Sequence, residues 1–192
     1  MKKNAILIFV MIIAGVAGFG LQRTLINQKN QNLTPELPDA QTNIVGQQRP
    51  DFGLKDIEGQ MRNINEWDGK VILVNFWATW CPPCKKEIPA FMALQDEYAE
   101  QGFQVIGIAI DDEESVKDYV DTMGINYPVM AAELAAMEVS RWYGNRLNAL
   151  PYSAFINRDG KIIYTRSGEL TKAQVEHIIK PLLGLATDYA SQ

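Results

Sequence analysis

The sequence predicts an α/β domain, a three-layer α/β/α sandwich around a central mixed sheet. Two almost wholly apolar runs, 71–77 and 103–110, are typical of parallel strands that are covered on both faces. Between them, apolar residues recur at helical spacing over 88–98. A strand, a helix and a strand over about 40 residues form a right-handed βαβ unit. A hairpin expected around the turn at 158–160 adds antiparallel strands, so the sheet should be mixed.

The other elements carry turn or capping signals. We expect an N-terminal hairpin over 52–64 and three further helices over 111–124, 131–143 and 171–182. Residues 23–48 are rich in Gln, Asn, Pro and Thr without periodicity, which predicts a flexible linker. We assign 49–185 to one folded domain and 186–192 to a C-terminal tail.

Composition and charge exclude some classes of function. The hydrophobic content of 47% is ordinary for a globular domain and sufficient for a core. The formal net charge is −5, and no basic stripe is visible, so a nucleic acid is not expected as a partner.

The N-terminus has the pattern of a membrane segment. Lys2 and Lys3 precede an uncharged apolar run over 5–21, which is just long enough to span a bilayer. The lysines favour an N-terminus in the cytoplasm, so 1–22 is predicted to be a single-pass anchor with the domain on the other side. The alternative is a signal peptide cleaved after the small residues at 15–17, which would release the domain.

The chain has only two cysteines, Cys81 and Cys84, at the expected strand-to-helix turn. A helix N-terminus favours a thiolate because its free N–H groups and dipole stabilise negative charge. A structural zinc site needs about four ligands, and the single histidine, His177, is far along the chain. A structural disulfide closing so short a ring contributes only about 2 kcal/mol. We therefore predict a redox dithiol that needs no metal or other cofactor, because C-x-x-C beside a βαβ pattern is a thioredoxin-like signature.

Two segments carry a resemblance to a known family. The segment 75–89 reads NFWATWCPPCKKEIP, and Leu150-Pro151 stands ahead of the C-terminal hairpin. Over 49–183 the chain resembles the TlpA/ResA/DsbE group of membrane-anchored thiol–disulfide oxidoreductases of bacteria. The resemblance implies a thioredoxin-like fold with a strand–helix insert between Cys84 and Pro151. It also implies anchoring in the bacterial inner membrane, with the domain in the periplasm or otherwise outside the cytoplasm; the cleaved form would be periplasmic.

The resemblance also suggests roles for individual residues. Cys81, first in the pair and at the helix start, is expected to be the nucleophile, and Cys84 the cysteine that resolves the mixed disulfide. Glu87, one helical turn later, is the candidate proton acceptor for Cys84. It would replace the buried aspartate that cytoplasmic thioredoxins carry at the position of Asn75. Pro151 is expected to be cis and to face the cysteines.

Further residues should contact the substrate. We expect Trp80, Pro82 and Leu150 to bind it, the last through its backbone. Relatives often carry Thr or Val where this chain has Leu150, which affects specificity. Pro82 and Pro83 remove two N–H groups that could stabilise the Cys81 thiolate, which favours a reductant over a strong oxidant.

The predicted function is the reduction of protein disulfides outside the cytoplasm. The resemblance suggests apocytochrome c as a substrate and a membrane thiol carrier as the electron donor. A tethered copper-delivery module is a competing interpretation, although no His or Met ligands stand close to the cysteines. A peroxiredoxin-type peroxidase is another, but its P-x-x-x-[ST]-x-x-C pattern would place Val74 and Ala78 where Pro and Ser or Thr belong.

Overall fold

The computed structural model describes residues 44–186. The anchor or signal segment predicted for 1–22 lies outside the described residues, as do 23–43 of the predicted linker and 187–192 of the predicted tail. Within 44–186, no helix combines the length and the apolar character needed to cross a bilayer.

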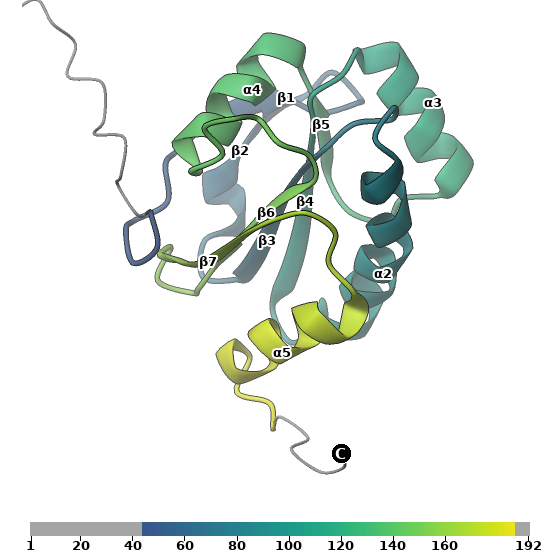
Figure 1. Cartoon of the computed structure of the whole chain (residues 1–192). Helices are drawn as coiled ribbons and strands as arrows, with labels where there is room; N and C mark the ends of the chain where they lie inside the picture. The colour runs from purple at the N-terminus through teal and green to yellow at the C-terminus, as the bar shows by residue number, and fades with distance from the viewer. Residues whose placement is uncertain (1–43, 187–192) are drawn as a thin grey trace, which may run out of the picture. The chain divides into compact units, whose positions relative to one another are not determined.

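A five-stranded mixed sheet forms the middle layer, in the order β5-β4-β3-β6-β7 (Figure 1). Its strands are β3 (Val71–Trp77), β4 (Phe103–Ala109), β5 (Val129–Ala131), β6 (Tyr152–Ile156) and β7 (Ile162–Ser167). Strands β3 and β4 pair in parallel, which confirms the predicted βαβ unit, and β5 continues this parallel part. Strand β6 pairs antiparallel with both β3 and β7, which confirms the mixed sheet.

Helices cover both faces of the sheet, as the sandwich prediction requires (Figure 1). The N-terminal hairpin consists of β1 (Gly53–Lys55) and β2 (Met61–Asn63). The helices are η1 (Ile64–Trp67), α2 (Pro82–Tyr98), α3 (Glu113–Met123), α4 (Glu133–Trp142) and α5 (Lys172–Leu182). Helices α2, α3 and α5 pack on one face, and α4, η1 and β1 pack on the other. The strand–helix insert implied by the resemblance lies in a stretch that holds β4, α3, β5 and α4.

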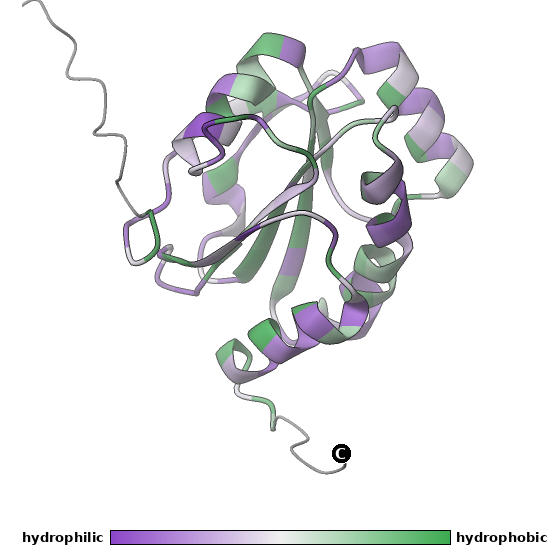
Figure 2. Ribbon diagram, viewed as in Figure 1, coloured by the Kyte–Doolittle hydropathy of each residue, from purple (hydrophilic) through white to green (hydrophobic). Residues whose placement is uncertain are grey.

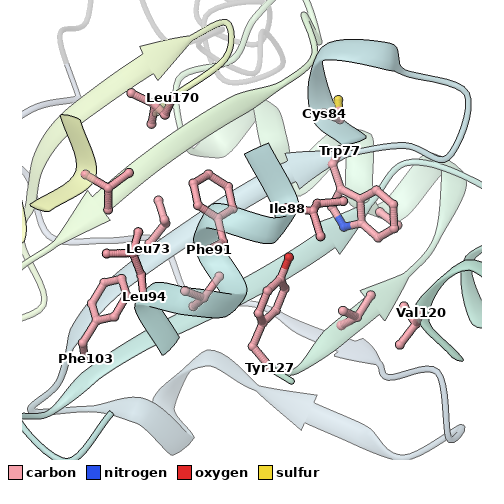
Figure 3. Packing of buried hydrophobic residues seen from close by; sticks show 14 of the residues in the cluster. Leu73, Trp77, Cys84, Ile88, Phe91, Leu94, Phe103, Val120, Tyr127 and Leu170 are labelled. Carbon is pink, nitrogen blue, oxygen red and sulfur yellow. The ribbon is translucent and has the colours of Figure 1, made fainter. Parts of the chain in front are cut away.

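Alternation along the central strand supplies both cores. Val71, Leu73 and Trp77 of β3 point toward α2, whereas Ile72 and Phe76 point toward α4. Hydrophobic residues are concentrated along the central strands in Figure 2, and Figure 3 shows how they pack against α2. Burying a side chain of this size stabilises the fold by about 1.5–3 kcal/mol.

The last residues of the predicted linker run beside the C-terminal hairpin. The N–H of Gly46 donates to the carbonyl of Ile162 at 2.7 Å, and the N–H of Ile162 donates to the carbonyl of Gln47 at 3.0 Å. Gln48 forms an isolated antiparallel bridge with Lys161. Residues 44–48 are therefore attached to the sheet through backbone hydrogen bonds.

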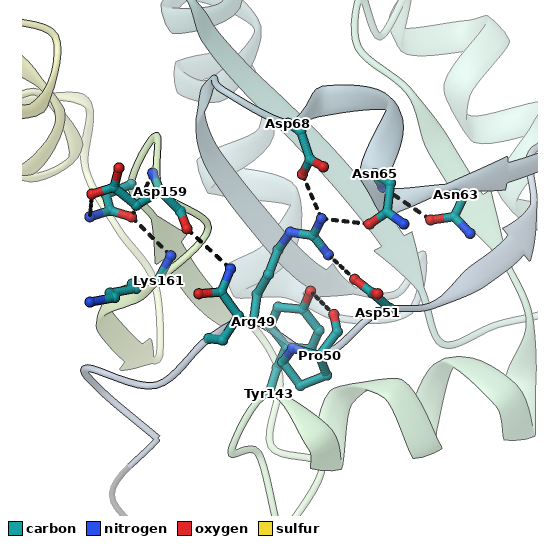
Figure 4. A network of polar contacts seen from close by, with 11 residues as sticks. Arg49, Pro50, Asp51, Asn63, Asn65, Asp68, Tyr143, Asp159 and Lys161 are labelled. Atoms are coloured by element: carbon teal, nitrogen blue, oxygen red, sulfur yellow. Dashed lines mark hydrogen bonds and ion pairs between the residues drawn. The ribbon is translucent and has the colours of Figure 1, made fainter.

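Arg49 fixes the chain where it enters the folded domain (Figure 4). Its buried guanidinium donates to Asn65 and to Asp68, both at 2.6 Å, and forms an ion pair with Asp51. On the other side of this segment, the hydroxyl of Tyr143 donates to the carbonyl of Pro50 at 2.9 Å. The N-terminal end of the domain is thus held against both η1 and the end of α4.

Candidate active site

The two cysteines lie where β3 gives way to α2, as the sequence predicts. Cys81 is the N-cap of α2, and its Sγ accepts a hydrogen bond from the N–H of Cys84 at 3.4 Å. The pair is joined by a disulfide with an S–S distance of 2.02 Å. Cys84 is fully buried and Cys81 is 4% exposed, so Cys81 is the more accessible residue of the pair. Figure 3 shows Cys84 at one end of the core cluster that contains Trp77 and Ile88.

Asp111 holds the turn that leads to Cys81. One oxygen of its carboxylate accepts from the N–H of Thr79 at 2.9 Å and from the Thr79 hydroxyl at 2.6 Å. The neighbouring Asp112, not Asp111, caps α3 by accepting from the N–H of Ser115. The acidic run at the start of α3 therefore has two separate roles, and the sequence suggested only the capping one.

Glu87 is a buried carboxyl one helical turn after Cys84. It is 1% exposed and accepts from Asn75 Nδ2 at 2.8 Å and from the N–H of Leu170 at 2.9 Å. Burial raises the pKa of Glu87 to about 7, against the lowering effect of these two hydrogen bonds; the nearby Glu169 adds to the rise. A carboxyl with this pKa exchanges protons readily near neutral pH.

Asn75 connects three elements beneath the cysteines. Besides Glu87 on α2, its Nδ2 donates to the hydroxyl of Ser153 on β6 at 3.1 Å. Its Oδ1 is buried and accepts no hydrogen bond from the residues that the structure describes. Ser153 is fully buried, and no sequence pattern pointed to this contact. The Asn75 side chain carries no acidic group, so Glu87 is the acidic member of this group.

Pro151 lies at the same edge of the sheet as the end of β3. The Leu150–Pro151 peptide bond is cis, which confirms that prediction. The register pairs Phe76 with Tyr152, so Pro151 precedes β6 close to the point where β3 ends. The carbonyl of Pro151 accepts from the N–H of Gly168 at 2.9 Å, which ties it to the end of β7.

The residues expected to contact substrate differ in exposure. Trp80 is 65% exposed and Pro82 is also exposed, on either side of Cys81 in the chain. Leu150 is half-buried and packs against both hydrophobic clusters. Across residues 44–186, no group of three or more His, Cys, Asp or Glu side chains is arranged to hold a metal ion.

Comparisons with known proteins agree with this geometry. The sequence model of the AhpC/TSA family matches residues 45–165. The thiol-disulfide oxidoreductase ResA of Bacillus cereus (strain ATCC 10987 / NRS 248) is 32% identical over 186 residues, which cover 95% of this chain and 99% of that protein. ResA of Halalkalibacterium halodurans is 36% identical over 141 residues, which cover 71% of this chain and 78% of that protein.

Solved structures show the same fold. A thiol:disulfide interchange protein of the thioredoxin family from Chlorobium tepidum TLS superposes with a TM-score of 0.64 at 33% identity, covering 76% of this chain and all of that one. StoA from Bacillus subtilis superposes with a TM-score of 0.56 at 26% identity, covering 67% of this chain and 96% of that one.

The matches include the cysteine turn, and the fold around it is thioredoxin-like. The protein is therefore an enzyme of thiol–disulfide exchange that acts on protein thiols, with the Cys81–Cys84 disulfide as its redox-active group. The chain belongs to the AhpC/TSA family of thioredoxin-fold proteins, with relatives that are thiol-disulfide oxidoreductases of the ResA type.

Proposed function

We propose that the protein reduces disulfides in other proteins, with Cys81 as the nucleophile and Cys84 as the resolving cysteine. The thiolate of Cys81 attacks one sulfur of a substrate disulfide, and the other substrate sulfur leaves and takes up a proton. Cys84 then gives its proton to Glu87 and attacks the Cys81 sulfur. The Cys81–Cys84 disulfide forms, the substrate is released as a dithiol, and two electrons have passed to it.

The observation that carries this proposal is the buried carboxyl of Glu87 beside Cys84. Residues three apart on a helix lie on the same face, about 5–6 Å between Cβ atoms. Cys84 is fully buried, and its thiol must lose a proton before its sulfur can attack Cys81. A nearby base with a pKa of about 7 therefore gives the second step an acceptor that is half-ionised near neutral pH.

The substrate is proposed to dock over Trp80, Pro82 and Leu150, close to Pro151. The exposed ring of Trp80 offers a large apolar contact beside Cys81. Proline has no N–H, so Pro151 offers no backbone hydrogen-bond donor to the Cys81 sulfur. The backbone of the preceding residue, Leu150, is proposed to pair with an extended substrate chain.

The proposed setting is outside the cytoplasm, with residues 1–22 as the anchor in a bacterial inner membrane and 23–48 as the linker, whose last residues, 44–48, are held against the C-terminal hairpin. Residues 49–185 are the domain and 186–192 the tail. A membrane thiol carrier would return electrons to the disulfide, and apocytochrome c is the proposed substrate. Cell fractionation, with the mass of the mature N-terminus, separates the anchored form from the cleaved periplasmic form.

Insulin-disulfide reduction, with excess dithiothreitol to re-reduce the Cys81–Cys84 disulfide after each turnover, tests the function directly. We expect repeated turnover in the wild type, none in Cys81→Ser, and a trapped mixed disulfide in Cys84→Ser. Trapping in the native host identifies the substrate. Full activity in Cys81→Ser would refute the assignment of the nucleophile, and stoichiometric copper uptake without turnover would favour the binding module. A reduction potential near about −120 mV, the value for DsbA, would refute the reducing direction.

A further inference from the structure

The loop between α4 and β6 is closed by one buried side chain. Asn145 is 4% exposed, and its Oδ1 accepts from the N–H of Ala149 at 2.9 Å while its Nδ2 donates to the carbonyl of Ala149 at 2.9 Å. The same Nδ2 donates to the hydroxyl of Ser140, a fully buried residue of α4, at 2.9 Å. The amide of Asn145 therefore pairs with both backbone groups of Ala149, as a neighbouring strand would.

A second asparagine fastens the same loop to α4. Asn148 has a positive φ of 47°, a conformation that asparagine tolerates better than most residues. With its amide oxygen facing Arg141, it accepts from the guanidinium Nε and Nη2 at 3.2 Å each and donates to the carbonyl of Met137 at 3.1 Å. Its backbone N–H donates to the carbonyl of Asn145 at 3.1 Å. The loop from 145 to 149 thus has a defined shape.

This shape holds a large apolar side chain in solvent. Leu147 lies between the two asparagines and is 91% exposed, the highest exposure among the large hydrophobic residues of 44–186. It stands three residues before Leu150, a reach of at most about 10 Å along the chain. A polypeptide that pairs with the backbone of Leu150 would pass within reach of Leu147.

We propose that Asn145 is a positioning residue for protein substrates: it clamps the loop so that Leu147 contacts the substrate chain and Leu150 meets its backbone. The inference deepens the proposed function and rests on it, because it assumes that the substrate docks along the segment that leads to Pro151. The side-chain hydrogen bonds of Asn145 go to Ser140 and Ala149, so the proposed clamp acts on the loop and not directly on the Cys81 sulfur. The loop acts on the docking of long chains and leaves small disulfides unaffected.

The test compares two substrates in the full-length protein. Insulin supplies a polypeptide disulfide, and 5,5′-dithiobis(2-nitrobenzoate) supplies a small one that needs no docking along the loop. For Asn145→Ala and Leu147→Ser we expect the KM for insulin to rise by about three- to tenfold, the equivalent of one lost contact, with the rate on the small disulfide unchanged. Leu147→Met, which keeps an apolar side chain of similar size, should restore the wild-type KM.

A matched control is Asn126→Ala. The Asn126 amide also ties a loop to a helix, because it donates to the carbonyl of Met92 at 3.0 Å and to Asp96 at 2.7 Å, both on α2. Asn126 lies on another surface loop. It should leave the kinetics on both substrates unchanged. If Asn145→Ala does not fold, the exposed Leu147→Ser variant decides the matter.

Three results would overturn the inference. They are an unchanged KM for insulin in Leu147→Ser, an unchanged KM in a folded Asn145→Ala, and an equal loss on both substrates in either variant. All three results concern the variants. If the proposed function itself fails, the wild type reduces the small disulfide but does not turn over insulin, and the inference fails together with the proposed function.

Discussion

At the scale of single residues, the state of Glu87 links the chemistry to the stability of the fold. Its carboxyl is buried on α2, one helical turn after Cys84, and accepts hydrogen bonds from Asn75 and from the N–H of Leu170. Burial is the larger effect, so the pKa of Glu87 rises to about 7 in the folded protein. In the unfolded chain this carboxyl has its ordinary pKa near 4.5. The folded state therefore binds more protons than the unfolded state between these two values.

The first prediction concerns the free energy of unfolding of the oxidised protein. Because the folded state binds the extra proton, stability falls as pH rises from about 4.5 to about 7, by about 3 kcal/mol from Glu87 alone. Urea unfolding at about pH 5 and about pH 8 measures this fall, and Glu87→Gln should remove most of it. The oxidised form is used because its disulfide does not titrate. An equal slope in Glu87→Gln would show that other groups cause the pH dependence.

The second prediction concerns the rate of the resolving step. If Glu87 accepts the proton of Cys84, the release of substrate from the mixed disulfide should accelerate as pH rises through about 7, where Glu87 ionises. In Glu87→Gln the step should slow by roughly 10²- to 10⁴-fold near neutral pH, and the inflection near 7 should disappear. Stopped-flow measurement of thiol release across pH tests this. An unchanged pH–rate profile would remove Glu87 from the mechanism.

At the scale of elements, the turn between β3 and α2 depends on a contact with the end of β4. Strands β3 and β4 are parallel, so their carboxyl ends meet at one edge of the sheet. Thr79 follows the first strand and Asp111 follows the second, and this places the carboxylate where it accepts two hydrogen bonds from Thr79. In the sheet β4 and β6 flank β3 on opposite sides, so Asp111 holds the turn before Cys81 from the β4 side, whereas Pro151 stands on the β6 side.

The third prediction separates this clamp from ordinary helix capping. Asp111→Ala leaves the N–H and hydroxyl of Thr79 without their acceptor, which should cost about 1–3 kcal/mol of stability and slow exchange at Cys81 with a small disulfide. Asp112→Ala removes the N-cap of α3 and should cost a similar amount, about 0.5–2 kcal/mol, without slowing exchange. Urea unfolding and reaction rates on both variants test this. Equal rates in the two variants would show that Asp111 matters only for stability.

At the scale of the whole molecule, local patterns predicted the architecture but not the contacts that complete the site. Apolar runs, helical periodicity and turn residues located the βαβ unit and the C-terminal hairpin because these signals act over neighbouring residues. The resemblance brought Glu87 and Pro151 into the site. Ser153 was missed because it meets Asn75 only through the pairing of β6 with β3, across 78 residues of chain. Such contacts depend on register and packing, which composition does not encode.

Two other site features differ in how far they could have been predicted. The contact between Asp111 and Thr79 was not predicted, but the sequence held a signal for it. Each is a polar residue just beyond the carboxyl end of a parallel strand. The clamp made by Asn145 had no such signal. Asparagine in a loop is ordinary, and only the folded structure shows that its amide bonds to both backbone groups of Ala149.

The N-terminal boundary of the domain gives the fourth prediction. The sequence placed it at Arg49, yet residues 46–47 exchange two backbone hydrogen bonds with Ile162. At about 0.5–1.5 kcal/mol each, these bonds should make a chain that begins at residue 44 more stable than one that begins at 49 by about 1–3 kcal/mol.

Urea unfolding of the two truncated chains measures the difference. Gly46→Pro in the longer chain keeps the length but removes the N–H that bonds to Ile162, and proline cannot adopt the φ of +93° found at Gly46, so this variant should lose the gain in stability. Equal midpoints for all three chains would place the boundary at Arg49, with 44–48 adding nothing to the fold.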